Sequence, residues 1–535
     1  MKTYYWFVIA LLMAGVMESA HADVRLPHLF SNHMLLQREL PIAVWGWAEP
    51  GEEITVKFAG QTATVTTDAA GQWQVHLQAL PAGGPYDLTV AGKNTVTFTD
   101  VIVGDVWICA GQSNMEWLLG FGQGGSDTNV HATTARDIAA ATNTMIRWLT
   151  DTGPASRDPL TDIPTNNSWV VCSPRTVEGA SAVGYFFGKR ITTETGVPIG
   201  LINCAWGGSA IEPWTPPVGL RAVPELAGML QEYEARLASY NSELGKYVDV
   251  AATWVETARA ARKSGTLIPD LPTPPVNPVK VIHSQGLSLS VIYNARVAPL
   301  TRYGIKGVLW YQGEANGSEG DIYYHKMRAL IGGWRTVWNQ GEFPFYYVQL
   351  ANWQAPSENP AGGDGWAALR MAQLKALQIP HTGMALAIDV GDAKDIHPRN
   401  KEDVGNRLAV WALKNEYGQK DLVCSGPLYQ GMTIEDNKVR IRFDSVGRGL
   451  MIGKKQGHGP AKDDLEGKLQ RFAIAGEDKH WVWADAVIDG ATVVVSSPVV
   501  LRPVAVRYAY SMNPDGCNLY NQDGLPASPF RTDSW

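Results

Sequence analysis

The sequence predicts an α/β protein in which a parallel sheet lies between two layers of helices, with a smaller β domain at each end. Five short runs in the middle of the chain are apolar at successive positions, which is typical of strands buried on both faces. Segments with apolar residues three and four positions apart lie between these runs and predict helices. Both ends of the chain alternate apolar and polar residues instead, which favours exposed β-structure.

The first 22 residues predict an export signal. Lys2 gives a positive start, residues 4–17 are largely apolar, and Ala20-His21-Ala22 forms a small-x-small cleavage site. This apolar run of 14 residues is shorter than the roughly 20 that span a bilayer. We therefore expect a secreted or periplasmic protein that starts near Asp23 and has no stable membrane insertion.

Residues 23–100 predict an N-terminal β-sandwich domain. The runs 43–47, 53–58 and 72–77 have strand character, and turn sequences rich in Gly, Pro and Asp separate them. Short strands punctuated in this way are typical of a small sandwich.

Residues 101–418 predict the main α/β domain. The five apolar runs are residues 105–110, 198–205, 304–311, 343–350 and 382–390. The helix candidates between and after them are residues 183–195, 324–338, 366–377 and 401–415. Strands that alternate with helices predict a doubly wound, three-layer sheet.

An insertion at about 216–281 interrupts this alternation. Residues 224–244 have a helical apolar stripe, and residues 269–278 are rich in proline, which indicates an extended linker. The insertion is interpreted as a lid, a substrate wall or a packed excursion, and the sequence does not choose among these.

Residues 419–535 predict a C-terminal β domain. Strand-like runs occur at 437–443, 469–473, 481–484, 491–496 and 505–510.

Composition excludes some classes of function. A formal net charge of −7 argues against a nucleic-acid partner, which requires a basic face. The 20 Trp and 19 Tyr suit a sugar-binding surface as well as a large core. Among five cysteines no CxxC occurs, so a structural zinc site is not expected. Cys109 and Cys204 are interpreted as buried thiols, whereas Cys424 and Cys517 are candidates for a disulfide in an exported protein.

Candidate chemistry lies where the predicted strands end, because ligands of open α/β sheets bind outside the carboxyl ends of the strands. Ser113 follows the first strand in Gly-Gln-Ser-Asn-Met, at a strand-to-helix turn where backbone N–H groups can stabilise an oxyanion. This is not the Gly-x-Ser-x-Gly elbow. A serine at this position is also a common helix cap, so Ser113 alone does not define an active site.

The second and third strands end in candidate hydrogen-bond donors. The glycines of Ala-Trp-Gly-Gly-Ser, among them Gly208, allow a ligand to approach the backbone closely. The third strand leads into Trp-Tyr-Gln-Gly-Glu-Ala-Asn, where Asn316 can donate to an oxyanion and Glu314 is an acid at the rim. Each of these residues also occurs in ordinary loops.

His397 follows the fifth strand and is a candidate general base. Carboxylates lie two and five positions before it, at Asp395 and Asp392. A carboxylate fixes the imidazole tautomer and stabilises the imidazolium that forms. Asn400 is expected to cap the helix that follows.

Nucleophile, donors and base occur in the order Ser, Gly, Asn, then Asp and His. This order, and the motifs Gly-Gln-Ser-Asn-Met, Trp-Gly-Gly-Ser-Ala-Ile-Glu-Pro-Trp, Trp-Tyr-Gln-Gly-Glu-Ala-Asn and Asp-Ile-His-Pro, resemble the SGNH hydrolases. More narrowly, they resemble the sialate O-acetylesterase family and its relatives among bacterial polysaccharide acetylesterases. The resemblance covers most of the mature chain and implies a flavodoxin-like parallel sheet.

The resemblance also implies roles for individual residues. Ser113 matches the nucleophile and His397 the base, while the N–H groups of Ser113 and Gly208 and the Asn316 amide match the oxyanion donors. Further substrate-binding candidates are Gln112, Gln312 and Glu314.

The acid is left open among three residues. SGNH hydrolases have Asp three positions before the histidine, and position 394 here is Lys. Asp395 is favoured, Asp392 is its rival, and Glu314 is the third candidate.

The expected activity is hydrolysis of acetyl esters on sugars through an acetyl-enzyme, with no metal or organic cofactor. The substrate implied by the resemblance is a 9-O-acetyl sialate, and the alternative is an acetylated plant polysaccharide such as xylan or xyloglucan. A non-catalytic sugar-binding protein is a further alternative. A glycosidase that uses Glu314 and an Asp would leave Ser113 unexplained.

Overall fold

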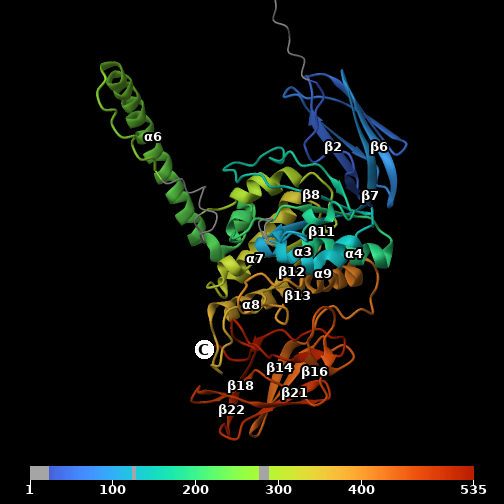
Figure 1. The fold of residues 1–535 in the computed structure, drawn as a ribbon, viewed down its shortest axis with the longest axis vertical. Coiled ribbons are helices and arrows are strands. Elements are labelled where there is room, and N and C mark those ends of the chain that lie inside the picture. Colours follow the sequence, from blue (N-terminus) through green and yellow to red (C-terminus); the bar gives the residue numbers. More distant parts are fainter. Residues whose placement is uncertain (1–22, 123–127, 276–287) are drawn as a thin grey trace, which may run out of the picture.

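The computed structural model describes residues 23–122, 128–275 and 288–535 (Figure 1). The expected export signal lies outside the described residues. An N-terminal β region, a central α/β region and a C-terminal β region follow one another along the long axis of the molecule, and one long helix projects to the side. In the described part of the chain, no helix is both long and apolar enough to cross a bilayer.

The central region is a mainly parallel sheet with the order β13-β12-β11-β7-β10-β8-β9. The five expected strands are β7 (Thr95–Gly111), β10 (Ile199–Asn203), β11 (Gly307–Tyr311), β12 (Phe345–Gln349) and β13 (Thr382–Leu386). In chain order they lie 2-1-3-4-5 across the sheet, which is the flavodoxin-like arrangement. The fold class predicted from the sequence is confirmed.

Two further strands extend the sheet beyond β10, and the sequence analysis missed both. They are β8 (Ile146–Thr150) and β9 (Val170–Val171). Arg147 breaks the apolar run of β8, yet it is buried because its guanidinium donates to the Asp100 carboxylate at 2.9 Å and to the carbonyl oxygen of His33 at the same distance. A charged residue paired in this way is compatible with a buried strand.

Helices cover both faces of the sheet. On one face, α4 (Ala182–Thr195) and α9 (Lys401–Glu416) pack against each other and over Trp107 and Cys109 of β7. On the other face, α7 (Ile322–Trp338) and α8 (Gly365–Lys375) cover Val106 and Ile108. Successive residues of β7 therefore face two different cores, as expected for a strand buried on both sides. Other α-helices of this region are α2 (Ser113–Glu116), α3 (Thr128–Ala139) and α5 (Pro217–Arg221).

The N-terminal β region is joined to the central sheet through β7. Its strands are β1 (Leu35–Gln37), β2 (Ile42–Trp47), β3 (Glu53–Phe58), β4 (Gln61–Thr66), β5 (Gln72–Leu77) and β6 (Gly83–Ala91). β6 pairs with the first part of β7, and β1 pairs with its middle in parallel. β7 thus crosses the expected domain boundary at residue 100 and continues to the edge of the sheet that carries Ser113.

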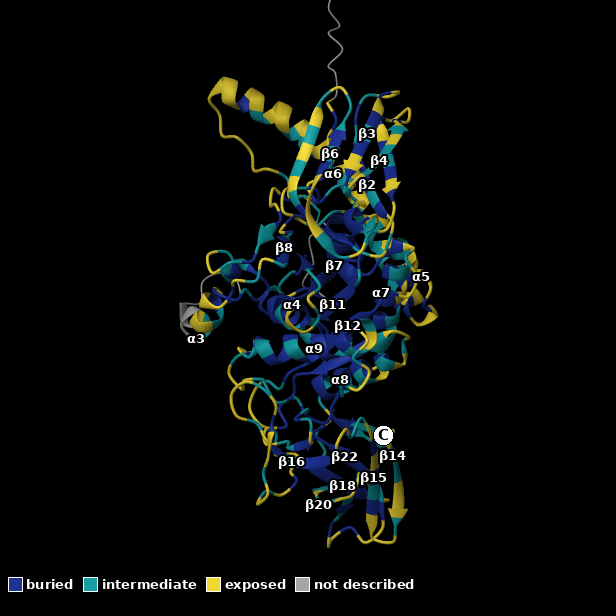
Figure 2. Cartoon of the chain, turned by 90° about the vertical axis from the view of Figure 1, so that its right-hand side faces the viewer, coloured by how far each residue is buried: buried dark blue, intermediate teal, exposed yellow. Residues whose placement is uncertain are grey.

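The insertion contains a single long helix, α6 (Ala227–Ser264), which projects away from the body (Figure 1). The helix predicted over 224–244 was therefore too short. Ala261 is the one buried residue among the 38 of α6, and most of the helix is exposed in Figure 2. The apolar stripe used for the prediction ends near residue 244, whereas the helix continues to Ser264. The last turns of α6 have no apolar stripe from which they could be predicted. Residues 276–278 of the expected proline-rich linker lie outside the described residues.

The C-terminal β region has its own core around Ile441, Phe472, Val493 and Phe530. Its strands are β14 (Leu428–Glu435), β15 (Lys438–Asp444), β16 (Leu450–Lys454), β17 (Lys462–Asp463), β18 (Phe472–Gly476), β19 (Trp481–Trp483), β20 (Asp485–Asp489), β21 (Thr492–Ser496), β22 (Pro503–Tyr508), β23 (Leu519–Asn521) and β24 (Phe530–Arg531). All strand pairs in this region are antiparallel.

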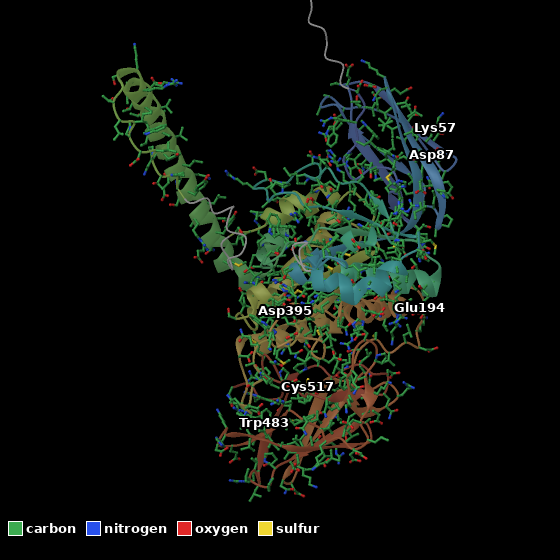
Figure 3. The ribbon with its side chains drawn as sticks, in the orientation of Figure 1. Lys57, Asp87, Glu194, Asp395, Trp483 and Cys517 are labelled. Atoms are coloured by element: carbon green, nitrogen blue, oxygen red, sulfur yellow. The ribbon has the colours of Figure 1, made fainter. Side chains whose placement is uncertain are left out.

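The cysteines are all thiols in this structure. Cys109 and Cys204 are buried, as expected from their apolar strands. The disulfide considered between Cys424 and Cys517 is not formed in this structure, where both side chains are free thiols. Cys517 lies in the C-terminal β region (Figure 3).

Candidate active site

Ser113 lies at the carboxyl edge of the central sheet, where β7 ends and α2 begins. The last residue of β7 is Gly111, with φ +131°. A Cβ atom at this position would lie 2.2 Å from the carbonyl oxygen of Tyr311 on β11. Only glycine fits both the conformation and the space, so it allows the chain to turn tightly and place Ser113 above the sheet.

The imidazole of His397 meets the Ser113 hydroxyl. The two residues are 284 positions apart, and His397 Nε2 lies 2.9 Å from Ser113 Oγ. His397 belongs to the irregular loop between β13 and α9, and Asn400 caps α9 by accepting from the backbone N–H of Asp403. The distance is suitable for proton transfer from hydroxyl to imidazole.

Asp395 is the carboxylate that contacts the imidazole. Its Oδ1 lies 3.1 Å from His397 Nδ1 and also accepts the backbone N–H of His397 at 2.9 Å. The rival Asp392 accepts the backbone N–H of Lys394 at 2.8 Å instead. The third candidate, Glu314, accepts from the Asn114 amide at 2.5 Å. In this structure only Asp395 of the three makes a hydrogen bond to His397.

The surroundings of His397 favour its neutral form. Burial lowers the pKa of His397, and the nearby positive charge of Lys401 lowers it further, while Asp395 acts in the opposite direction. The ring of Trp117 lies 5.7 Å from the imidazole and contributes to this burial. A neutral imidazole at neutral pH is the form that accepts a proton.

Gly208 lies in the loop after β10, next to the Ser113 turn. The backbone N–H of Trp206 donates to the carbonyl oxygen of Gly111 at 2.9 Å, which fixes this loop beside the end of β7. Gly208 has φ +70°, a left-handed conformation that favours glycine. The loop that carries Gly208 is therefore held beside the end of β7 through Trp206.

Asn316 is more buried than its expected role requires. Its side chain has no exposed surface, and its Nδ2 donates to Glu212 Oε2 at 3.1 Å. Its Oδ1 accepts from the backbone N–H of Ile211 at 3.0 Å and from Gln312 Nε2 at 2.8 Å. In this structure the Asn316 amide links the loops that follow β10 and β11.

Two ion pairs beside Asn316 could not be predicted from the sequence motifs. Lys326 Nζ lies 2.5 Å from Glu212 Oε1 and 2.5 Å from Glu319 Oε2, and all three side chains are buried or nearly so. Glu212 stands in the Trp-Gly-Gly-Ser-Ala-Ile-Glu-Pro-Trp motif, so the motif was seen but not its lysine partner. Lysine is rarely buried unless paired, and its position on α7 gives no sequence signal of that partner.

The two glutamines considered for substrate binding are also buried. Gln112 Oε1 accepts from Gln312 Nε2 at 3.2 Å and from the backbone N–H of Ala315 at the same distance. Gln312 Oε1 accepts from the Tyr323 hydroxyl at 2.7 Å. These contacts hold the loop after β11 against the Ser113 turn.

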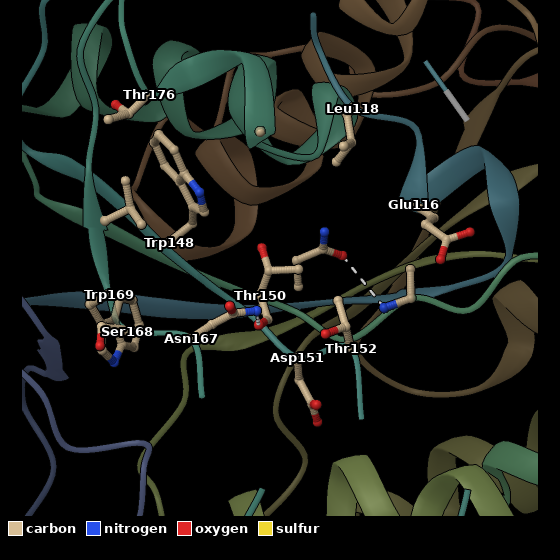
Figure 4. Close-up of a pocket in the computed structure, with 14 residues that line it drawn as sticks. Glu116, Leu118, Trp148, Thr150, Asp151, Thr152, Asn167, Ser168, Trp169 and Thr176 are labelled. Atoms are coloured by element: carbon tan, nitrogen blue, oxygen red, sulfur yellow. Dashed lines mark hydrogen bonds between the residues drawn. The ribbon is translucent and has the colours of Figure 1, made fainter. Parts of the chain in front are cut away.

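A pocket of about 720 Å³ opens beside this turn, over the ends of β8 and β10 (Figure 4). Glu116 of α2 lies on one side of the pocket, and Trp148 and Trp169 lie on the other side. Thr150, Asn167 and Asn203 add polar groups to the lining. Within residues 23–122, 128–275 and 288–535, no group of three or more His, Cys, Asp or Glu side chains is placed to hold a metal ion.

This site combines a serine at a strand-to-helix turn with an imidazole and a carboxylate in hydrogen-bond contact. It lies at the carboxyl edge of a parallel sheet, which is the arrangement of a serine hydrolase. The family described as carbohydrate esterase, sialic acid-specific acetylesterase matches residues 103–252 and 284–414, more than half of the chain. The chain belongs to this family. It is a carboxylic ester hydrolase of the carbohydrate O-acetylesterase type.

Known relatives cover nearly the full length of the chain. The sialate O-acetylesterase of Mus musculus is 27% identical over 571 residues, which is 98% of this chain and 97% of that protein. The sialate O-acetylesterase of Homo sapiens is 27% identical over 562 residues, with coverage of 96% and 93%. The crystal structure of a carbohydrate acetylesterase from Xanthomonas citri is 36% identical, with a TM-score of 0.75, and covers 96% of this chain and 100% of that chain.

Proposed function

We propose that this protein hydrolyses acetyl esters on sugars with Ser113 as the nucleophile, His397 as the general base and Asp395 as the carboxylate that orients the base. The observation that carries the proposal is the continuous contact from Ser113 Oγ to His397 Nε2 at 2.9 Å, and from His397 Nδ1 to Asp395 Oδ1 at 3.1 Å.

The reaction has two half-reactions. His397 takes the hydroxyl proton as Ser113 Oγ attacks the acetyl carbonyl carbon, and Asp395 stabilises the imidazolium. His397 then returns the proton to the sugar oxygen as the C–O bond of the ester breaks, which leaves an acetyl-serine. In the second half, His397 activates a water molecule that attacks this acetyl group. Acetate leaves, and Ser113 recovers its proton.

The tetrahedral intermediates require donors for the developing oxyanion. The proposed donors are the backbone N–H groups of Ser113 and Gly208 and the side-chain amide of Asn316. Removal of one such donor costs about 2.7–4 kcal/mol of transition-state stabilisation in comparable sites. In this structure the Asn316 amide donates to Glu212 and also hydrogen-bonds the Glu319 carboxylate, so its participation requires that it give up one of these two bonds.

The test is Ser113→Ala, assayed on 4-nitrophenyl acetate and on an O-acetylated sugar. We expect acetate release to fall by about 10³-fold or more, with no change in the melting temperature. Ser239→Ala is the matched control, because Ser239 is exposed on α6, bonds Glu243 of the same helix and does not line the pocket. Wild-type turnover by Ser113→Ala would refute the proposal, and a non-catalytic sugar-binding protein would release no Ser113-dependent acetate.

For the sugar, the family favours an O-acetylated sialic acid, in keeping with the names of the relatives. A second candidate is a neutral sugar of an acetylated plant polysaccharide, and the pocket supports it. The charged residues that line the pocket, Glu116 and Asp151, are both acidic. Burial raises the pKa of both carboxyls, which suits hydrogen bonds to neutral sugar hydroxyls. The pocket lining in the described part of the chain includes no Lys or Arg to pair with the carboxylate of a sialic acid. Acetate release from O-acetyl sialic acid, compared with acetylated xylan or xyloglucan, separates the two.

We also propose that residues 1–22 direct export and are removed. The supporting pattern is the positive start, the apolar run and the small-residue cleavage site. N-terminal sequencing of the protein from periplasm or culture medium is expected to begin near Asp23. An intact N-terminus on protein confined to the cytoplasm would contradict this.

A further inference from the structure

Lys401, the first residue of α9, is buried directly behind the Ser113–His397 pair. It is 2% exposed, and its Nζ donates to Asn114 Oδ1. The ammonium lies 5.0 Å from the ring centre of Trp117 and 5.5 Å from that of Tyr311. Burial removes water from the charged ammonium of a lysine, which costs free energy of folding. Apolar packing would not require a charged group at this position.

Asn114, the partner of Lys401, contacts both halves of the proposed catalytic pair. It follows Ser113 directly in the chain. Its Nδ2 donates to the carbonyl oxygen of Ile396, the residue before His397, at 3.2 Å, and to Glu314 Oε1 at 2.5 Å. One amide group therefore joins the end of β7, the loop after β11 and the histidine loop.

We propose that Lys401 is a positioning residue for the ester hydrolysis: by fixing the Asn114 amide, it holds the Ser113 turn and the His397 loop at their working separation. The inference rests on the proposed function of Ser113 and His397. No ligand contact is assigned to Lys401, because it is buried beneath the site and acts through Asn114.

The charge of Lys401 adds an electrostatic effect to this positioning. The groups that face it are Glu314 from the loop after β11, Asp395 and His397 from the histidine loop, and the rings of Tyr311 and Trp117. Burial lowers the pKa of Lys401 to about 7, against the attraction of Glu314 and Asp395. Lys401 therefore carries its charge in the more acidic range in which His397 titrates, where it opposes protonation of the imidazole.

The experiment compares Lys401→Met with the wild type over about pH 4.5–9 on 4-nitrophenyl acetate, a range that brackets the ordinary histidine pKa. Methionine keeps an unbranched apolar side chain but removes the ammonium. We expect kcat to fall by about 10–100-fold with little change in KM, because a small misplacement of reacting groups costs rate and not ground-state binding. We also expect the acid limb of kcat/KM to move to higher pH, since the loss of a neighbouring positive charge raises the pKa of His397.

Lys414→Met is the matched control. Lys414 lies in the last turn of the same helix and donates to the carbonyl oxygen of Leu422 at 2.8 Å, at the end of α9 away from Ser113. It should leave kcat, KM and the pH profile unchanged. A Lys401→Met profile that coincides with this control would overturn the inference.

A double-mutant cycle with Asn114→Ala tests whether Lys401 acts through Asn114. Residues that act through one network have non-additive effects, so the double variant should be little slower than the slower single variant. Additive losses would overturn the proposed route. If Lys401→Met does not fold, Asn114→Ala alone decides: a wild-type kcat refutes the inference. The results with Lys401 and Asn114 variants do not decide the proposed function, which is refuted only if Ser113→Ala keeps its activity.

Discussion

The Ser113 turn and the His397 loop form one site, but they are held in different ways. The Ser113 turn is enclosed by strand ends, with Gly111 against β11 and Trp206 bonded to the end of β7. The His397 loop has no regular structure, and the Asp395 side chain that holds the imidazole is 34% exposed. The proposed nucleophile is fixed by the sheet, whereas the proposed base is fixed by a few side-chain hydrogen bonds. Substitutions should therefore disrupt the fold on the first side and adjust chemistry on the second.

The largest effect is expected from Gly111→Ala on the nucleophile side. The added Cβ would approach the Tyr311 carbonyl oxygen to 2.2 Å at a φ of +131°, so strand β7 or β11 must shift. Strain at a disallowed backbone conformation costs about 1–3 kcal/mol, and the steric clash adds to it. We expect a lower melting temperature and loss of esterase activity together, measured by thermal unfolding and acetate release.

Gly265→Ala is the control for that comparison. Gly265 ends α6 with a φ of +71°, and a Cβ there would have no neighbour within 4 Å. The substitution should cost about 1 kcal/mol of local helix stability and leave activity intact. Equal effects of the two substitutions on melting temperature and activity would contradict the idea that the close packing around Gly111 fixes the Ser113 turn.

The intermediate effect is expected from Asp395→Asn on the base side. The neutral amide keeps the shape of the side chain but no longer stabilises the imidazolium, so kcat should fall by about 10²–10⁴-fold with an unchanged melting temperature. Asp392→Asn is the matched control and should stay close to wild type, because Asp392 bonds a backbone N–H and not the imidazole. The reverse pattern of rates would make Asp392 the acid.

The smallest effect is a shift in pH dependence. The ordinary pKa of histidine is 6.5, and burial together with Lys401 lowers it at His397. Activity requires the neutral imidazole, so kcat/KM should rise with pH and reach half its plateau below pH 6.5. Asp395→Asn removes a negative charge that favours the imidazolium, so its residual activity should reach half-maximum at a still lower pH. A midpoint above 6.5 in the wild type would show that burial does not control this base.

The Ser113 turn and the His397 loop also differ in how far the sequence predicts them. The meeting of Ser113 and His397 could be predicted because parallel strands end at one edge, so residues far apart in the chain meet there if each follows a strand. Asp395 was the favoured acid although Lys394 occupies the usual position, and a two-residue spacing suffices because the loop turns Asp395 back onto His397.

Other parts of the site could not be predicted, since they depend on partners that sequence patterns do not reveal. The burial of Lys326 and Lys401 is set by Glu212, Glu319 and Asn114, which lie on other elements. The burial of Asn316 follows from the same packing. β8 was missed because its buried arginine has partners in the N-terminal region.

The shared strand β7 has a consequence for the modularity of this enzyme. A module that can be exchanged or cut away normally meets its neighbour at a flexible linker. Here the seam is a strand of 17 residues, Thr95–Gly111, whose first part completes the N-terminal sheet and whose last residue is separated from Ser113 only by Gln112. Removal of the N-terminal β region would expose the unpaired edge of that strand to other chains, so this region and the esterase core should be inherited, expressed and engineered as one piece.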